Sequence, residues 1–381
     1  MLKFIYRFFL GLVALVVLAS LGLWLSGNDY LFKGLYATYL HGEKSATIDD
    51  AQFFDTRSIP AGEGQAWALA KNYNSIPLSD SLKHYLEKTR SIAFLAIKRD
   101  SIISESYWGF GSDSSHSNSF SMAKSITSML AQIAIQKGIF NSWEDKVQNY
   151  LPELKGPFAA ELNIGQCSDM TAGLDWNEHY TNPFDITARA YYGDDIEETV
   201  LEHVQVSIKP GSQYEYQSGA TQILGLCLRE ATGKSLAELA SEWLWKPLGA
   251  EHEAFWQLDD DKGKELAYCC FNSNARDFAR FGKLLLNFGN WDGQQILDSA
   301  YVKDASAAKL VDFYGRSFWI ETESTGEKCF YMRGINGQYI MVIPSQDLVL
   351  VRLGHERLEN VNHHPRDFYV YLQEGLRLFG D

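Results

Sequence analysis

The sequence has no cluster of basic residues beyond its first few positions, and its net charge is −14. Proteins that bind nucleic acid carry a concentrated positive surface, so this charge balance argues against nucleic acid as a partner. Apolar residues are not lacking: 46% of the chain is hydrophobic and 22% is charged, which argues against disorder. No repeat or low-complexity tract occurs in the 381 residues. We therefore expect a globular protein with a large core, in one big domain or two.

Cysteine is scarce, and its spacing is not that of a metal site. An odd number of cysteines leaves at least one thiol free unless two chains cross-link. One disulfide is compatible with an exported domain, but its pairing cannot be read from the sequence. No metal and no organic cofactor are expected. The cysteines are Cys167, Cys227, Cys269, Cys270 and Cys329.

Two common catalytic motifs are also missing. There is no Gly-x-Ser-x-Gly sequence, so an α/β-hydrolase nucleophile has no support. The sequence around Lys234 resembles the end of a phosphate-binding loop, but Leu228 stands where that motif needs its first glycine. A nucleotide site of this kind is therefore not predicted.

The longest uncharged apolar run, residues 8–25, lies at the N-terminus and contains 18 positions. At about 1.5 Å per residue it spans roughly 27 Å, close to the thickness of a bilayer core. Lys3 and Arg7 precede it, which favours a cytoplasmic N-terminus. A cleavable signal peptide is the alternative, but its apolar region is usually shorter, and residues 19–21 make a poor cleavage site. We expect residues 1–27 to form an uncleaved signal anchor.

Ser121 and Lys124 begin the most informative segment of the chain. The apolar periodicity of residues 121–137, followed by Gly138, predicts a helix with Ser121 in its first turn. Residues three apart share a helix face, so the lysine amine can lie beside the serine hydroxyl. A serine becomes a strong nucleophile when a nearby base removes its proton, and a helix N-terminus offers free N–H groups to an oxyanion. Ser121 is therefore a candidate nucleophile.

The same spacing recurs at Ser306 and Lys309. This second copy lies in residues 301–310, a short alanine-rich segment with polar flanks. We expect an exposed helical turn there, without a strong apolar helix behind it. The four-residue pattern is weak by itself, so the first copy needs partners elsewhere in the chain.

Two later segments contain candidate partners for Ser121. Tyr216 follows a Pro-Gly turn and precedes a helical pattern, and its hydroxyl can accept or relay the serine proton. In the second segment, Gly334 lets the backbone approach a ligand closely. An edge strand there would let the N–H of Ile335, together with that of Ser121, hold an oxyanion.

In their order, Ser121-x-x-Lys124, Tyr216-x-Ser218 and the segment 332–334 resemble the motifs of the penicillin-recognising serine hydrolases, the class C β-lactamase and esterase superfamily. The resemblance covers about residues 75–381. It implies an acyl-enzyme on Ser121, with Lys124 and Tyr216 moving the proton.

Two departures from the family pattern bear on the substrate. Ser218 replaces the asparagine of Tyr-x-Asn, and Met332 replaces the lysine of Lys-Thr-Gly, with Arg333 one place on. In the family that lysine helps to bind the substrate carboxylate, so its absence implies poor hydrolysis of β-lactams. The segment 333–338 is more similar to 6-aminohexanoate-oligomer hydrolases and carboxylesterases than to β-lactamases.

A polar and aromatic cluster follows Gly173 and either lines the substrate cleft or packs as a loop on its own aromatic rings. The side chains that we expect to bind substrate are Ser218, Arg333, Gly334, Asn336, Asp175 and Tyr180.

Strand patterns occur at both ends of the chain, with helical patterns between them. They predict an α+β fold, in which the N- and C-terminal segments form one antiparallel sheet with flanking helices and an inserted, mainly helical subdomain. The resemblance implies the same α/β sandwich, with the site at the junction. The predicted strands are residues 91–97, 102–108, 316–322, 328–332, 338–343 and 348–353, and a last helix spans residues 365–379.

The sequence thus predicts a connecting region at residues 28–75 and a β-lactamase-related serine hydrolase domain at residues 76–381. The substrate is expected to be a small ester or amide, and the oligomeric state stays open. The alternatives are a β-lactamase or penicillin-binding-type DD-peptidase, and an inactive relative that binds cell-wall peptide. The signal anchor implies a single-pass protein of a bacterial inner membrane, with the catalytic domain in the periplasm or at the cell exterior.

Overall fold

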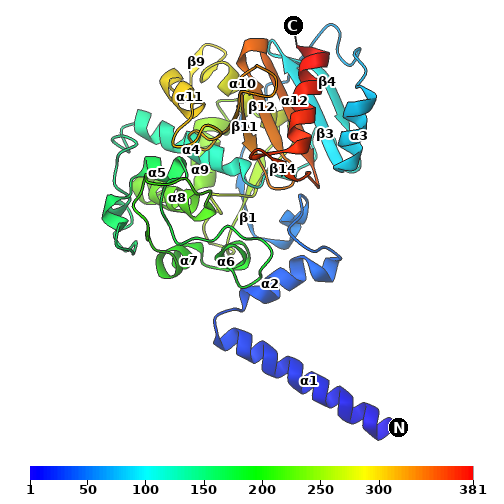
Figure 1. The fold of residues 1–381 in the computed structure, drawn as a ribbon, viewed down its shortest axis with the longest axis vertical. Helices are drawn as coiled ribbons and strands as arrows, with labels where there is room; N and C mark the ends of the chain where they lie inside the picture. The colour runs from blue at the N-terminus through cyan, green and yellow to red at the C-terminus, as the bar shows by residue number, and fades with distance from the viewer. Residues whose placement is uncertain (381) are drawn as a thin grey trace.

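Strands from both ends of the chain form the central sheet of the molecule (Figure 1). The computed structural model describes residues 1–380. Neighbouring strands are antiparallel, except that β2 runs parallel to β4. In sheet order the strands are β10 (Trp319–Glu321), β11 (Cys329–Arg333), β12 (Tyr339–Ile343), β13 (Leu348–Gly354), β3 (Ser91–Lys98), β4 (Ser101–Tyr107) and β2 (Ala68–Leu69). The mixed α+β class expected from the sequence is therefore confirmed.

Helices occupy most of the remaining chain. The α-helices of the described residues are α1 (Leu2–Leu25), α2 (Tyr30–Ala37), α3 (Asp80–Lys88), α4 (Met122–Gln136), α5 (Ile164–Ser168), α6 (Ile186–Tyr192), α7 (Ile196–His203), α8 (Ser218–Thr232), α9 (Leu236–Ala240), α10 (Ala275–Leu286), α11 (Ser299–Ala305) and α12 (Arg366–Phe379). Figure 1 shows α12 and α3 beside the central sheet, and the helices from α5 to α8 gathered away from it.

Helices α10 and α12 pack on opposite faces of the central sheet. A Cβ atom on Gly375 of α12 would lie 2.3 Å from the Leu350 side chain, and one on Gly282 of α10 would lie 2.4 Å from Val349. Leu350 and Val349 are neighbours in β13, so their side chains point to opposite faces. Both helices thus approach the sheet at glycines, which lets their backbones pack closely against it.

A second sheet, absent from the sequence prediction, lies under the start of α4. Its strands are too short to leave a clear alternation in the sequence, because they hold only two to four residues each. In sheet order they are β1 (Thr56–Ile59), β6 (Ala254–Gln257), β7 (Phe271–Ser273) and β5 (Ser117–Asn118). Two small hairpins complete the strands, β8 (Asn290–Trp291) with β9 (Gln294–Gln295) and β14 (Asn360–Val361) with β15 (His364–Pro365).

Two details of the sequence prediction are wrong. The strand expected at residues 316–322 is shorter, because Ser317 has a left-handed φ of 62° and donates its N–H to the Ser168 carbonyl. The turn at residues 301–310 is not uniformly exposed. Ser306 is only 4% exposed. The apolar side of α11 packs against the core, and Ser306, directly after the helix, is buried with it.

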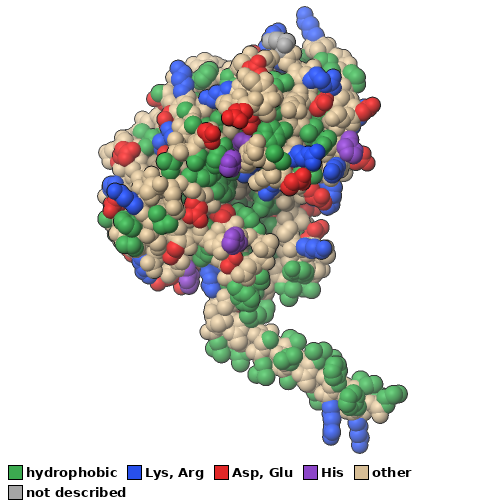
Figure 2. Space-filling view, viewed as in Figure 1, with side chains coloured by type: hydrophobic (Ala, Val, Ile, Leu, Met, Phe, Trp, Pro, Cys, Tyr) green, Lys and Arg blue, Asp and Glu red, His purple; other side chains and the backbone are tan. Residues whose placement is uncertain are grey.

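The N-terminal helix α1 extends away from the rest of the molecule, and none of its residues is buried (Figures 1 and 2). Figure 2 shows apolar side chains along this helix and basic side chains near its free end. The helix is long and apolar enough to cross a membrane, and these properties suit an anchor and a signal sequence alike.

The segment after α1 is attached to the rest of the protein. The Tyr30 hydroxyl donates to the Pro183 carbonyl at 3.1 Å, and Lys33 donates to the Asp259 carbonyl at 2.9 Å. Strand β1 then joins the second sheet. Residues 28–75 therefore form contacts with the rest of the chain along much of their length.

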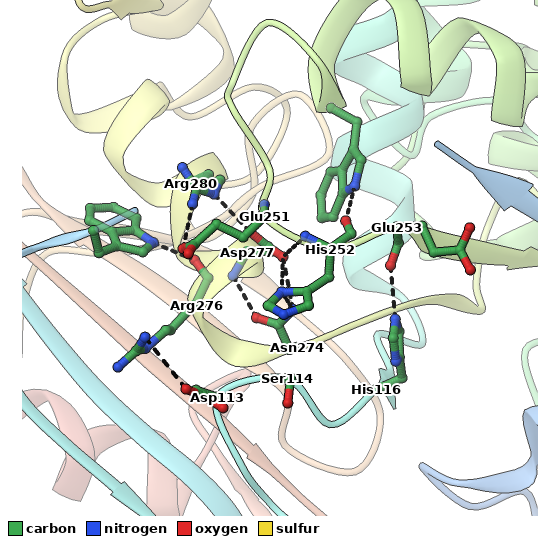
Figure 3. A network of polar contacts seen from close by, with 12 residues as sticks. Asp113, Ser114, His116, Glu251, His252, Glu253, Asn274, Arg276, Asp277 and Arg280 are labelled. Carbon is green, nitrogen blue, oxygen red and sulfur yellow. Dashed lines mark hydrogen bonds and ion pairs between the residues drawn. The ribbon is translucent and has the colours of Figure 1, made fainter. Parts of the chain in front are cut away.

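The start of α10 is held by a buried polar network (Figure 3). Asp277 accepts the N–H of Glu251 at 2.9 Å, the amide of Asn274 at 2.8 Å and the Nε of Arg280 at 2.8 Å. Asn274 is the N-cap of the helix. The block of sequence from residue 274 to 282 therefore fixes α10 against the turn at residue 251.

Candidate active site

Ser121 lies where a strand turns into a buried helix. It is the N-cap residue of α4, directly after Phe120, whose φ of 44° is left-handed and strained for a bulky residue. The side chain of Asn118 accepts the Phe120 N–H at 2.8 Å and supports this turn. Ser119 donates its N–H to the Phe271 carbonyl and accepts the Phe271 N–H on its hydroxyl. Hydrogen bonds from the Asn118 side chain and from the Phe271 backbone therefore fix the turn that holds Ser121.

The structure brings Lys124 next to Ser121, as the helical spacing predicts. The lysine Nζ lies 2.9 Å from the Ser121 Oγ and donates to the Tyr268 carbonyl at 3.1 Å. Its residue is 1% exposed. The same nitrogen lies 4.9 Å from the ring centre of Tyr216 and 5.4 Å from that of Tyr268. Ser121, Lys124 and Tyr216 thus form one cluster, in which the amine faces both the hydroxyl and the tyrosine rings.

Tyr216 is positioned by the residue that follows it. The buried Gln217 side chain donates to the carbonyls of Leu174 and Trp176 at 2.8 and 3.0 Å, which fixes the chain just before α8. The Tyr216 ring packs beside Trp319, with ring centres 5.5 Å apart. Its place in the site therefore depends on both the helical region and the edge of the central sheet.

The turn between β11 and β12 reaches the start of α4. A Cβ atom on Gly334 would lie 2.5 Å from the Ser119 carbonyl oxygen, so only glycine fits at this approach. In this turn Gly334 and Gly337 donate their backbone N–H groups within the turn itself. Among residues 1–380, no acceptor is recorded for the N–H of Ile335 or of Ser121. Both groups are thus available to an oxyanion.

Glu178 is a site residue that the sequence prediction did not assign. Its carboxylate accepts the Ser218 N–H at 2.7 Å, the Ser218 hydroxyl at 2.5 Å and the Trp176 indole N–H at 2.7 Å, and also a hydrogen bond from Tyr180. A Cβ atom on Gly219 would lie 2.4 Å from the Trp176 ring, so the indole packs directly on the first turn of α8. The sequence showed a polar and aromatic cluster here, but not which of its members turns towards α8.

Three residues of the predicted substrate-binding set have their hydrogen bonds and ring contacts outside the Ser121, Lys124 and Tyr216 cluster. The guanidinium of Arg333 lies 3.3 Å from the Trp319 ring centre and donates to the His363 carbonyl at 3.0 Å. Asn336 donates to the Ala46 carbonyl at 3.4 Å. Asp175 is exposed and accepts the Gln205 N–H at 2.6 Å. Their recorded contacts do not include Ser121, Lys124 or Tyr216.

The second serine–lysine copy lacks the geometry of the first. Lys309 pairs with Asp304, and the group near the Ser306 hydroxyl is the Lys328 amine at 3.4 Å. Ser306 donates to the Lys303 carbonyl at 3.3 Å. It therefore has a helix-capping contact and no lysine from its own motif.

The turn that holds Lys124 also contains a disulfide between adjacent residues, Cys269 and Cys270. The sequence did not show which cysteines pair; in the structure Cys269 pairs with Cys270, and the other three cysteines are free and buried. Within residues 1–380 no group of three His, Cys, Asp or Glu side chains is arranged to bind a metal.

A cavity of about 490 Å³ opens beside the β11–β12 turn. It is lined by Glu43, by residues 45–47, by Arg90 and Asn336, and by residues 355–359. None of the clustered residues Ser121, Lys124 and Tyr216 lines it, so we place the candidate site at that cluster and not at this cavity.

The fold and this site define a serine hydrolase. The chain belongs to the beta-lactamase family, whose model matches residues 78–373. A curated relative, the 6-aminohexanoate-dimer hydrolase of Paenarthrobacter ureafaciens, is 27% identical over an alignment of 296 positions, which covers 71% of this chain and 74% of the relative. The family resemblance inferred from the sequence motifs is therefore confirmed.

Solved structures share the fold. A putative 6-aminohexanoate-dimer hydrolase from Bacillus anthracis superposes with a TM-score of 0.73 at 24% identity, covering 86% of this chain and 92% of its own. A family VIII carboxylesterase superposes with a TM-score of 0.62 at 16% identity, covering 82% and 99%. At these identities the likeness supports the architecture alone.

Proposed function

We propose that this protein hydrolyses esters or amides of small molecules through an acyl-enzyme on Ser121. The observation that carries the proposal is the 2.9 Å contact between the Lys124 amine and the Ser121 hydroxyl, at the start of a buried helix. In such a pair the amine is the base that generates the serine nucleophile.

Each step of the proposed reaction has a group in place. Lys124 and Tyr216 together take the serine proton as Ser121 attacks the carbonyl carbon, and they return it to the leaving group. The N–H groups of Ser121 and Ile335 hold the negative oxygen of the tetrahedral intermediate. Water then attacks the acyl-enzyme by the reverse proton path and releases the acid. No cofactor enters these steps.

The nucleophile is tested with a fluorophosphonate probe, which labels activated serines. Ser121→Ala should abolish labelling, and Ser306→Ala should leave it intact, because only Ser121 has its motif lysine in contact. An inactive relative that only binds cell-wall peptide would not label at all. Labelling that survives Ser121→Ala would refute the assignment.

The charges at the position of the family lysine bear on whether the substrate is an ester or a β-lactam. Met332, at the position of the family lysine, is fully buried, and Arg333 is engaged by Trp319 and His363. A lost charge-assisted contact costs roughly 1.5–3 kcal/mol, or about 10- to 150-fold in rate. We expect kcat/KM for p-nitrophenyl butyrate to exceed that for nitrocefin by at least this factor. Equal turnover of the two would favour the β-lactamase alternative.

The finer architecture and the location belong to the same proposal. We infer an α/β sandwich at residues 76–381 with an inserted helical subdomain, joined through residues 28–75 to a signal anchor at residues 1–27. The anchor places the domain in the periplasm or at the cell exterior of a bacterium. Protease added to intact spheroplasts should then remove the domain, and protection from protease would argue for the opposite orientation.

A further inference from the structure

The turn between β11 and β12 contains the Ile335 N–H, and the hydrogen bonds within the turn decide where this group points. Gly337 donates its N–H to the Gly334 carbonyl at 3.1 Å, which closes the turn. The Gly334 carbonyl and the Ile335 N–H belong to one planar trans peptide, so they point in opposite directions. The bond that turns the carbonyl inward therefore directs the N–H outward. The direction of the oxyanion donor depends on keeping this turn closed.

Two arginines bind the next three carbonyls of the turn. Arg357 donates its Nε–H to the Ile335 carbonyl at 2.8 Å. Arg352 donates from Nη1 to the Asn336 carbonyl at 3.1 Å and to the Gly337 carbonyl at 2.8 Å. Hydrogen bonds from a charged donor are roughly twice as strong as neutral ones. The backbone that follows the Ile335 N–H is therefore held by cationic side chains.

Arg352 connects the turn to the central sheet. It belongs to β13 and is fully buried. Its other hydrogen bonds go to the Ser91 hydroxyl and to the carbonyls of Thr89 and Glu356. A buried charge is costly unless acceptors surround its N–H groups, and here backbone carbonyls provide most of them. The position of the guanidinium is thus fixed by the sheet, and the turn is fixed by the guanidinium.

Arg357 is more accessible than Arg352. It is only partly buried, and it lines the cavity beside the turn. It also donates to the Leu358 carbonyl at 3.2 Å and to the Asn360 side chain at 2.6 Å. In the described part of the chain, none of its recorded contacts is with the reacting cluster. A change at Arg357 can therefore disturb the turn without touching a reacting group.

We propose that Arg357 is a positioning residue for the oxyanion donor, on a turn that Arg352 ties to the sheet. By holding the Ile335 carbonyl, it keeps the Ile335 N–H directed at the carbonyl oxygen of the substrate. The inference rests on the proposed function and goes beyond it, by giving a role to a residue outside the reacting cluster. Acylation and deacylation both form an oxyanion, and its stabilisation acts on the transition state. Loss of Arg357 should therefore lower kcat and leave KM nearly unchanged.

Kinetics of the full-length protein in detergent test the proposal, with p-nitrophenyl butyrate as substrate and propylboronic acid as inhibitor. The boronic acid forms a tetrahedral adduct with an activated serine, and one of its oxygens takes the place of the oxyanion. For Arg357→Ala we expect kcat to fall by about 10- to 100-fold, the scale of a misplaced catalytic group, with KM within about threefold of the wild type. The inhibition constant Ki should rise by the same factor, because the adduct resembles the transition state.

The matched control is Arg90→Ala. Arg90 lines the same cavity, but its side chain pairs with Glu356 at 3.3 Å and not with the turn, so kcat and Ki should stay at their wild-type values. Arg357→Gln gives the same readouts if the alanine variant does not fold. An Arg357 variant that keeps the wild-type kcat or Ki, or that raises KM alone, overturns the proposal. A wild type that does not cleave p-nitrophenyl butyrate would instead count against the proposed hydrolase function.

Discussion

Lys124 occupies the most constrained position among the residues of the site. It is almost fully buried, and its amine lies between a hydroxyl, a carbonyl and two aromatic rings. A buried amine without a carboxylate partner exchanges its proton only with the groups that surround it. The proposed reaction assigns this exchange to Ser121 and Tyr216, so the lysine and the tyrosine should transfer the proton as one unit.

This coupling predicts non-additive losses in kcat. Lys124→Ala and Tyr216→Phe should each lower kcat for p-nitrophenyl butyrate by about 100-fold or more, the scale of general acid–base catalysis. The double variant should be little worse than the poorer single variant. Steady-state kinetics of the three variants measure this. Losses that multiply would assign independent roles to the two residues and require a different mechanism.

At the scale of elements, the local motifs could be predicted and the distant contacts could not. The contact between Ser121 and Lys124 follows from the helical period, because both residues belong to one turn of α4. The strand pairs β3–β4 and β12–β13 were also predictable, because short apolar runs are joined there by short turns.

The contacts of Glu178 illustrate what a single sequence does not contain. Its position depends on the packing of Trp176 against Gly219, which joins two segments far apart in the chain. The carbonyl that binds Lys124 belongs to Tyr268, and a backbone acceptor leaves no signal in the residue types. The expected roles of Arg333 and Asn336 depended on side-chain direction, which the sequence leaves open.

Helix α10 offers a test of stability at the same scale. Burial raises the pKa of Asp277, but hydrogen bonds from the Glu251 N–H and from Arg280 outweigh it, and the net pKa is lowered. A lowered folded-state pKa contributes stability above the unfolded pKa, and this contribution is lost as the pH falls through the folded value.

Asp277→Ala should therefore destabilise the protein by about 1.5–3 kcal/mol near pH 7, because Arg280 loses its buried carboxylate partner and keeps only Glu251. The loss should shrink as the pH falls from 7 to about 2, because the lowered folded-state pKa keeps the wild-type carboxylate charged until the pH is below its usual value of 3.8. Urea unfolding at both pH values measures it, with the exposed Asp261→Ala as control. A loss that does not change with pH would indicate that packing, and not charge, explains the effect.

At the scale of the whole molecule, the segment that follows α1 is coupled to the strand that leads to the nucleophile. Asp50 is 2% exposed and accepts the Tyr191 hydroxyl at 3.1 Å and the Asn118 amide at 3.5 Å. The Asn118 N–H donates to the Ile48 carbonyl at 2.8 Å. Because Asn118 also supports the turn before Ser121, any loosening of this segment should reach the site.

The charge of Asp50 should control that loosening. Burial raises its pKa to about 7, although its hydrogen bonds oppose the shift. With a raised folded-state pKa, the stabilisation is complete at pH values below the unfolded pKa, near 4, and is lost as the pH rises to about 7. Hydrogen exchange of residues 44–54, corrected for its intrinsic pH dependence, should therefore accelerate between pH 5 and pH 8 in the full-length protein. Asp50→Asn should remove this acceleration. The control Asp49→Asn, at the exposed neighbouring residue, should leave it unchanged. Equal acceleration in wild type and Asp50→Asn would show that another group controls the attachment of this segment.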